Sequence, residues 1–202
     1  LADDVDPPDE EEVGDHTDAA VWNRDTGAYE HLPTAVGGAR PNLATGPPLL
    51  SDDGTTAIVE SAATNLMSGN RNPGFELAVW DRVTDTLSAQ PLGNTGQAPS
   101  WPSDLTGMSG DGRFVSLLSS SSELVEGDEP DVRRELFVLD RATGHYERAP
   151  SGVGTNRPDD DLNVAGWTDD GRHVALWSRA TNLVPANPDQ LARGGIDTTT
   201  PD

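Results

Sequence analysis

The sequence repeats one pattern three times, and this repeat constrains the fold more than any single motif does. An Asp-Gly turn dipeptide recurs at Asp53, Asp111 and Asp170, which lie 58 and 59 residues apart. The same two spacings separate Leu66, Leu124 and Leu183, then Arg24, Arg82 and Arg141, then Pro41, Pro99 and Pro158, and also the acids Asp18, Glu76 and Glu135. Repeats of this length are typical of tandem arrays and propellers.

Each repeat reads as four short strands. The Asp-Gly turn leads into a second strand, which reads "TTAIVES", "RFVSLLS" or "RHVALWS", with apolar residues at alternate positions and mixed residues between them. A third strand ("AAVWNR", "LAVWDR", "LFVLDR"), another tight turn and a fourth strand follow. The 21 Gly, 16 Pro and only 34% hydrophobic residues also favour a strand-rich, turn-rich chain. We therefore expect an all-β protein, a β-propeller built of four-stranded antiparallel blades.

The repeat begins and ends in the middle of a blade. It predicts a half-blade at 19–33, blades at 46–92 and 105–150, and a half-blade at 164–187, between an acidic flexible head at 1–18 and a loop or tail at 188–202. About three blades' worth cannot close a ring, because propellers need about four to eight blades. We expect another protein chain, or the remainder of the same polypeptide, to complete the propeller.

The repeated residues resemble a known family. The stretches "TDDGRHVALWSRATNLV", "SDDGTTAIVESAATNLM" and "ELFVLDRATG" are similar to TolB-like β-propeller repeats of exported bacterial proteins. The resemblance covers residues 19–187, and its middle copy departs from the pattern with "SSSSELV" in place of "ATNLV". It implies a propeller that serves in recognition or as a scaffold, in a secreted or cell-surface location.

Charge and residue usage exclude several classes of function. The net charge is −22, and all 13 basic residues are Arg, so the surface should repel nucleic-acid backbones. The chain has no cysteine, which excludes disulfides, thiolate metal sites and Cys nucleophiles. It also contains no run of 18 apolar residues, so no membrane span is predicted.

The loops that vary between copies are the candidate binding residues. Antiparallel connectivity places the tight turns on one face and the long loops on the other, and variable loops on a rigid scaffold commonly carry binding. Trp101 has Leu43 and Asp160 at the equivalent positions, and two interpretations stand: an anchor for a sugar or protein, or a plug against the neighbouring blade. The predicted ligand-binding residues are Trp101, Asp104, Asp159, Asp160 and Asp161.

A calcium site is a weaker prediction from the loops between second and third strands. Asp128, Asp131 and Glu135 offer oxygen ligands, yet the chain contains no Asp-x-Asp-x-Asp-Gly series. Turn-forming and solvated carboxylates are the alternative for these residues and for Asp159–Asp161. No other cofactor is predicted.

Catalytic motifs are missing from the sequence: it has neither a G-x-S-x-G elbow nor an H-E-x-x-H motif. We therefore expect a non-enzymatic recognition or scaffold module that binds a protein or glycan through its long-loop face, such as a lectin-like or adaptor subunit of a secreted assembly. The alternative is the gating propeller of an oligopeptidase-type serine hydrolase whose catalytic domain lies outside this sequence.

Overall fold

The computed structural model describes residues 19–32, 41–67, 76–89, 92–97, 99, 103–128, 134–149 and 157–184. These residues form strands and loops, and they contain no helix that is long and apolar enough to cross a membrane. The strands are β1 (Ala20–Trp22), β2 (Tyr29–His31), β3 (Leu49–Leu50), β4 (Thr56–Ser61), β5 (Glu76–Asp81), β6 (Thr86–Ala89), β7 (Ser103–Met108), β8 (Phe114–Ser119), β9 (Glu135–Asp140), β10 (His145–Arg148), β11 (Leu162–Trp167) and β12 (Val174–Ser178).

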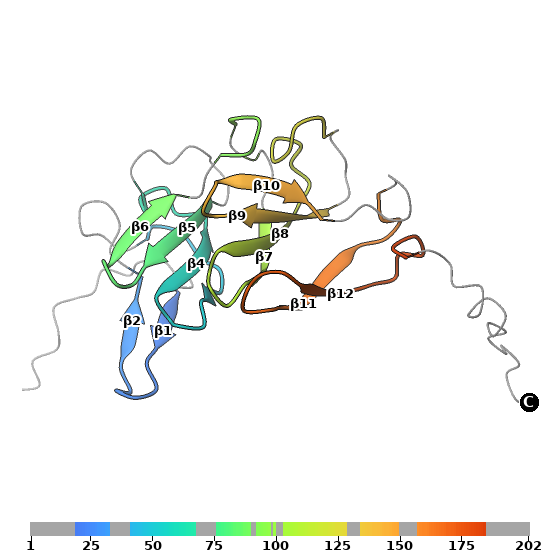
Figure 1. Ribbon diagram of the computed structural model, residues 1–202. Helices are drawn as coiled ribbons and strands as arrows, with labels where there is room; N and C mark the ends of the chain where they lie inside the picture. Colours follow the sequence, from blue (N-terminus) through green and yellow to red (C-terminus); the bar gives the residue numbers. More distant parts are fainter. Residues whose placement is uncertain are drawn as a thin grey trace, which may run out of the picture.

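The strands form two complete and two half sheets, all antiparallel. The four-stranded sheets have the orders β3-β4-β5-β6 and β7-β8-β9-β10, and the two-stranded sheets are the hairpins β1-β2 and β11-β12. Figure 1 shows the sheets stacked side by side, with the two hairpins at opposite ends. This sequential four-stranded pattern confirms the predicted all-β propeller fold. The strands of the described residues do not close a ring.

The repeated Asp-Gly turn is a hydrogen-bonded unit. The Ser109 hydroxyl donates to Asp111 Oδ1 at 2.6 Å and accepts the Phe114 N–H at 2.9 Å, while Gly112 adopts a φ of +71°. The other two copies make the same bonds through Ser51 and Asp53, and through Thr168 and Asp170. Donation from the Ser109 hydroxyl and the Arg113 backbone N–H lowers the pKa of Asp111. The Ser/Thr, Asp and Gly of this turn recur together because the same local conformation depends on all three.

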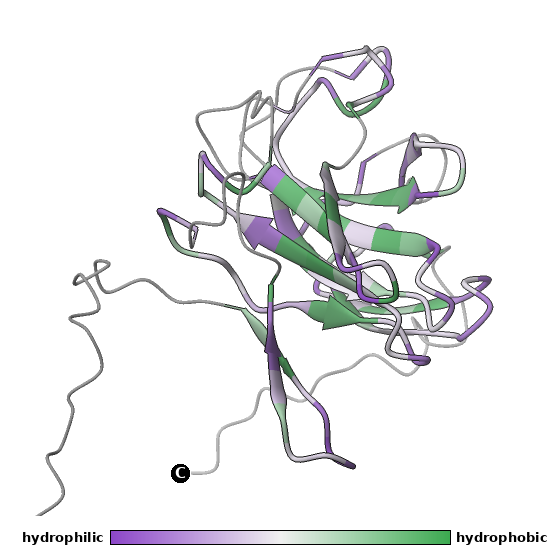
Figure 2. Ribbon diagram, turned by 90° about the vertical axis from the view of Figure 1, so that its left-hand side faces the viewer, coloured by the Kyte–Doolittle hydropathy of each residue, from purple (hydrophilic) through white to green (hydrophobic). Residues whose placement is uncertain are grey.

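The central strands pack on both faces, which explains why their sequences lack strict alternation. Alternate residues of β4 and β5 face the first hairpin and form one core cluster: Ala19, Val21, Leu32, Ala57, Val59, Ala63, Leu66, Ala78 and Trp80. The intervening residues face the next sheet and form a second cluster: Ile58, Leu77, Val79, Val115, Leu117, Leu124, Phe137, Leu139 and Tyr146. Figure 2 shows these apolar strand segments gathered inside the stack, with hydrophilic residues at its turns.

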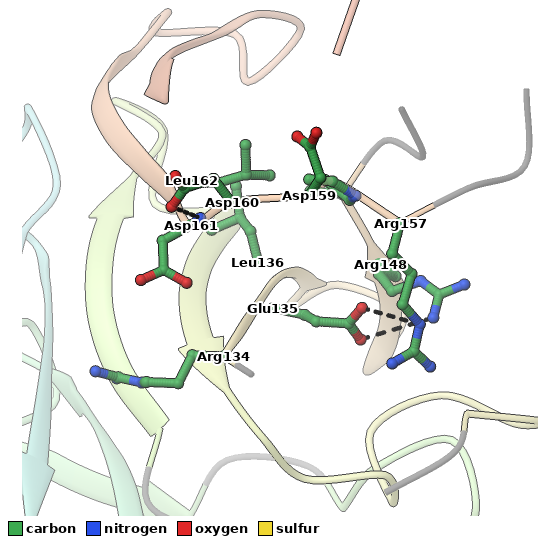
Figure 3. Close-up of a pocket in the computed structure, with 11 residues that line it drawn as sticks. Arg134, Glu135, Leu136, Arg148, Arg157, Asp159, Asp160, Asp161 and Leu162 are labelled. Atoms are coloured by element: carbon green, nitrogen blue, oxygen red, sulfur yellow. Dashed lines mark hydrogen bonds and ion pairs between the residues drawn. The ribbon is translucent and has the colours of Figure 1, made fainter. Parts of the chain in front are cut away.

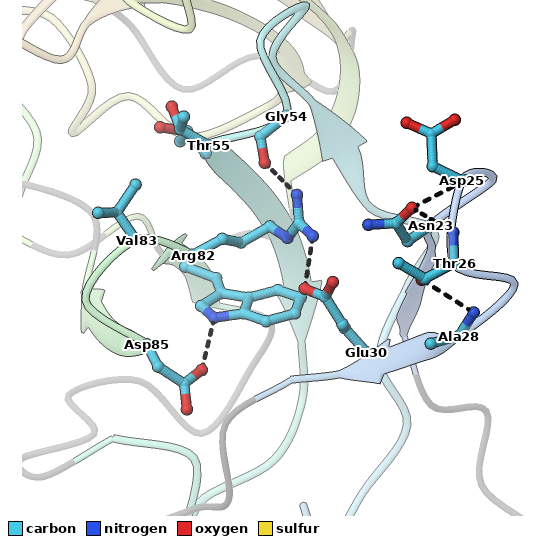
Figure 4. A network of polar contacts seen from close by, with 12 residues as sticks. Asn23, Asp25, Thr26, Ala28, Glu30, Gly54, Thr55, Arg82, Val83 and Asp85 are labelled. Carbon is cyan, nitrogen blue, oxygen red and sulfur yellow. Dashed lines mark hydrogen bonds and ion pairs between the residues drawn. The ribbon is translucent and has the colours of Figure 1, made fainter.

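Arginines after the third strands tie neighbouring parts of the stack together. Arg82 donates to the Gly54 carbonyl and forms an ion pair with Glu30 of the first hairpin (Figure 4). Arg141, its repeat equivalent, donates to the Gly112 carbonyl at 2.5 Å. An Arg at this position thus holds the tight turn of its own sheet. Arg82 also contacts the preceding sheet, through its ion pair with Glu30.

Candidate functional site

A cavity of about 190 Å³ lies on the face that carries the long loops, between the second four-stranded sheet and the segment that leads into β11. We call this the long-loop face, because β8, β9 and β10 each begin or end there at loops longer than the tight turns. The residues that line the cavity come from 134–136, 148–149 and 157–162: Arg134, Glu135, Leu136, Arg148, Ala149, Arg157, Pro158, Asp159, Asp160, Asp161 and Leu162.

A four-residue charge network adjoins the cavity, and three of its members, Glu135, Arg148 and Arg157, line one wall. Asp128, whose side chain is 3% exposed, accepts from Arg157 Nη2 at 2.6 Å and from Arg148 Nη1 at 3.0 Å. Glu135 accepts from Arg157 Nε at 3.2 Å and lies 3.6 Å from Arg148 (Figure 3). Two carboxylates and two guanidinium groups balance in charge, which is the usual condition for burying such groups. The network joins the loop before β9, the strands β9 and β10, and the segment before β11.

Asp159 has a structural role at the cavity rim. Its carboxylate accepts the Thr181 N–H at 2.7 Å and the Thr181 hydroxyl at 2.6 Å, and these bonds lower the pKa of Asp159. Two repeats earlier, Asn42 holds Thr64 through its own side chain: Asn42 Oδ1 accepts the Thr64 N–H, and Asn42 Nδ2 donates to the Thr64 hydroxyl. The "ATN" sequence that follows the second strand is therefore half of a loop clasp, and Asp159 or Asn42 is the other half.

Asp160 and Asp161 are the rim carboxylates that project from the clasp. Both are exposed, and Asp160 Oδ1 accepts the Asp161 N–H at 2.8 Å. Figure 3 shows the Asp161 carboxylate and the Arg134 side chain away from the Glu135 network, toward the other side of the cavity. The structure thus brings together three of the residues predicted to bind a ligand, Asp159, Asp160 and Asp161, with Glu135 of the predicted metal set.

The other predicted site residues lie elsewhere or outside the described part. Asp104, in β7, forms an ion pair with Arg134, which also lines the cavity. Trp101 and Asp131 lie outside the described residues. Among the described residues, no group of three or more His, Cys, Asp or Glu could hold a metal ion, and the oxygens of Asp128 and Glu135 face two guanidinium groups. The calcium site stays a prediction.

Glu60, in β4, interacts electrostatically with Asp104 and Arg134, and the sequence reasoning did not single it out. It occupies a position of the second strand where the other copies have Leu118 and Trp177, and that mismatch was the available signal. Burial, and then the nearby Asp104 charge, raise the pKa of Glu60 to about 7, while Arg134 acts in the opposite direction. Near neutral pH this carboxyl is therefore partly protonated.

Replacing Glu60 by glutamine should flatten the pH dependence of stability. The folded protein holds the Glu60 proton up to about pH 7, whereas the unfolded chain releases it near 4.5, so stability falls as pH rises through this window. The full shift corresponds to about 3 kcal/mol, and partial solvent exposure reduces this to about 1–2 kcal/mol gained by Glu60→Gln at pH 8. Urea unfolding from pH 4 to 8 measures the slope. An unchanged slope, equal to that of the exposed control Asp25→Asn, would contradict the assignment.

Comparisons with known proteins find distant matches among solved structures alone. No family model and no curated protein matches the sequence. Solved structures do match: TolB from Acinetobacter baumannii at 15% identity (TM-score 0.45), the tricorn protease at 14% (0.46), and a protein from Agrobacterium tumefaciens assigned to TolB at 13% (0.45). These alignments cover 79%, 79% and 82% of this chain, but 31%, 13% and 58% of the matched chains. The chain therefore spans only part of the length of each matched protein.

Proposed function

We propose that this chain is a non-enzymatic recognition module that binds a basic segment of a partner protein at the cavity of the long-loop face. One observation carries the proposal: the exposed carboxylates Asp160 and Asp161 stand at the rim of a cavity whose wall is already charge-balanced. Because Asp128 and Glu135 are committed to Arg148 and Arg157, the rim acids are the groups left to meet an incoming charge.

The ligand class follows from the charges and the shape. The net charge of −22 attracts cations over a distance, and the rim would then position an Arg or Lys side chain. Leu136 and Leu162 are buried lining residues, which supply apolar surface for the stem of such a side chain. A glycan is the other ligand class expected from the sequence, and it enters as an arm of the experiment. The extracytoplasmic location belongs to the same proposal, because it rests on the repeat resemblance.

The test is a binding titration of the 202-residue chain with three panels of probes. These are short Gly/Ser peptides containing Arg or Lys, the same peptides with Glu instead, and a panel of neutral and sialylated oligosaccharides. We expect binding to the basic peptides only. The double variant Asp160→Asn, Asp161→Asn should raise the Kd by about 5–30-fold, since two rim charges contribute about 0.5–1 kcal/mol each.

The control removes the same charge from the opposite face. Asp25 and Asp169 are exposed residues of the tight turns, so Asp25→Asn, Asp169→Asn alters net charge equally without touching the cavity. Equal loss of affinity in both double variants would show only general electrostatic attraction, and binding confined to oligosaccharides would overturn the ligand class. Hydrolysis of any probe by the pure chain would refute the non-enzymatic reading.

A further inference from the structure

Arg82 and Arg141 occupy the same position of the repeat but differ in their ionic partners. The Arg82 guanidinium group donates to the Gly54 carbonyl and to Glu30 of the preceding sheet (Figure 4). The Arg141 guanidinium group donates to the Gly112 carbonyl at 2.5 Å. Within the described part of the chain, this is its single hydrogen bond, and no carboxylate lies within ion-pair distance of it. Among these residues, Arg141 therefore has no counterpart of Glu30.

Ser88 accounts for this difference, because it stands at the repeat position of Glu30. Glu30 lies opposite Val21 in the first hairpin, and Ser88 lies opposite Val79 in the first complete sheet. Val21 and Val79 belong to the core clusters on the side of the following sheet, so Ser88 faces the second complete sheet as Glu30 faces the first. Ser88 is exposed, and its hydroxyl has no hydrogen-bond partner among the described residues. Its short, neutral side chain brings no charge to Arg141.

The Arg141 guanidinium group is half-buried, and its charge is only partly compensated. Burial lowers the pKa of Arg141, whereas the charge of Asp81 acts in the opposite direction. The Asp81 carboxylate is engaged in its own turn, where it accepts the backbone N–H groups of Val83 and Thr84 at 2.9 and 3.0 Å. Partial burial of a cation costs free energy when no anion contacts it, so an anion that reaches Arg141 is favoured.

We propose that Arg141 and Ser88 form a binding site for a small oxyanion: phosphate, sulfate or the carboxylate of a small acid. The oxyanion takes the place beside Arg141 that the Glu30 carboxylate takes beside Arg82. The guanidinium group supplies the charge and N–H donors, and the Ser88 hydroxyl adds one more donor. Because the net charge of −22 opposes the approach of anions, we expect a weak site that saturates at millimolar concentrations. Arg141 belongs to a tight turn, so the site is separate from the cavity of the long-loop face and independent of the ligand proposed there.

The test follows the arginine side chains by NMR during an anion titration. The chain contains 13 Arg and no Lys, so selective labelling of arginine gives a small set of Nε–H signals that single Arg→Lys substitutions assign. Sodium phosphate, sulfate and acetate are added separately at mildly acidic pH, and sodium chloride keeps the ionic strength constant. We expect at least one of the three salts to shift the Arg141 signal saturably, and the salts that do so show whether the site prefers a tetrahedral or a planar oxyanion. The Arg82 signal should stay in place, because Glu30 already occupies its partner position.

Three variants of solvent-accessible residues make the assignment specific while leaving the core intact. Ser88→Glu supplies the missing carboxylate, as Glu30 does for Arg82, and should abolish the saturable shift of Arg141. Glu30→Ser is the reciprocal change, and it should make the Arg82 signal respond to the same anions. Asp81→Asn removes the competing charge and introduces the residue type that Asn23 has at the equivalent position, so it should lower the anion Kd by about 2–5-fold.

Three results would overturn the proposal. The first is an Arg141 signal that none of the three salts shifts. The second is a set of equal, unsaturated shifts at all arginines, which would show general counterion association only. The third is an Arg141 response that persists unchanged in Ser88→Glu, since the anion would then bind somewhere other than beside Ser88.

Discussion

Replacing Tyr146 by alanine should lower the free energy of unfolding by about 3–5 kcal/mol, the range for truncating a buried aromatic residue. Tyr146 is 1% exposed and belongs to the core cluster between the two complete sheets. Its backbone is also clamped by Asn94 of the preceding interblade loop, which accepts the Tyr146 N–H at 2.9 Å and donates to its carbonyl at 2.7 Å. The ring therefore fills the space between sheets that the loop holds together.

Tyr29 supplies the matched control within the same chain. It occupies the equivalent repeat position but is 69% exposed, so Tyr29→Ala should change the stability of a single chain by less than about 0.5 kcal/mol. Urea unfolding measures both effects. Similar losses for the two variants would contradict the burial assigned to these positions.

The repeat made the architecture predictable because its landmarks are local. The Asp-Gly turns need a glycine at positive φ and a hydroxyl two residues before the aspartate, and both requirements are visible in the sequence. The packing of the second strands on both faces is also visible in the sequence, because apolar and small residues stand between the alternating apolar positions. Such features depend on neighbours within one hairpin, so a single sequence reveals them.

The cavity could not be predicted from the sequence, because it forms through contacts between residues that no local pattern links. Asp128 and Arg157 lie 29 residues apart, in loops that differ between copies, and only the folded chain brings them together. This pairing places guanidinium groups where the sequence suggested a cation, which could not be foreseen from a list of carboxylates. The structural role of Asp159 was more accessible, because Asn42 and Thr64 stand in the same relation as Asp159 and Thr181. The three adjacent acidic residues led to a prediction of ligand binding, whereas for Asp159 the comparison with Asn42 indicates a structural role in the loop.

Replacing Asp128 by asparagine should destabilise the protein by about 2–4 kcal/mol. The substitution preserves the shape of the side chain but removes the charge that two guanidinium groups share, at a site where the carboxylate is 3% exposed. Breaking a fully buried pair costs about 3–5 kcal/mol, and the partial exposure of Arg148 and Arg157, 34% and 31%, lowers that figure here. Because Asp128 links its loop to β10 and to the segment before β11, the cavity should also lose its wall and its ligand affinity.

The matched control is Asp104→Asn, which removes an aspartate from an ion pair of the same type. Asp104 and Arg134 are 54% and 42% exposed, so this pair should contribute no more than about 1 kcal/mol. Urea unfolding with and without calcium gives the decisive comparison for Asp128. If Asp128 serves the charge network, calcium leaves the stability of the wild-type chain unchanged. If calcium instead stabilises the wild type and not Asp128→Asn, the carboxylate is a metal ligand, and the guanidinium groups must move aside when the ion binds.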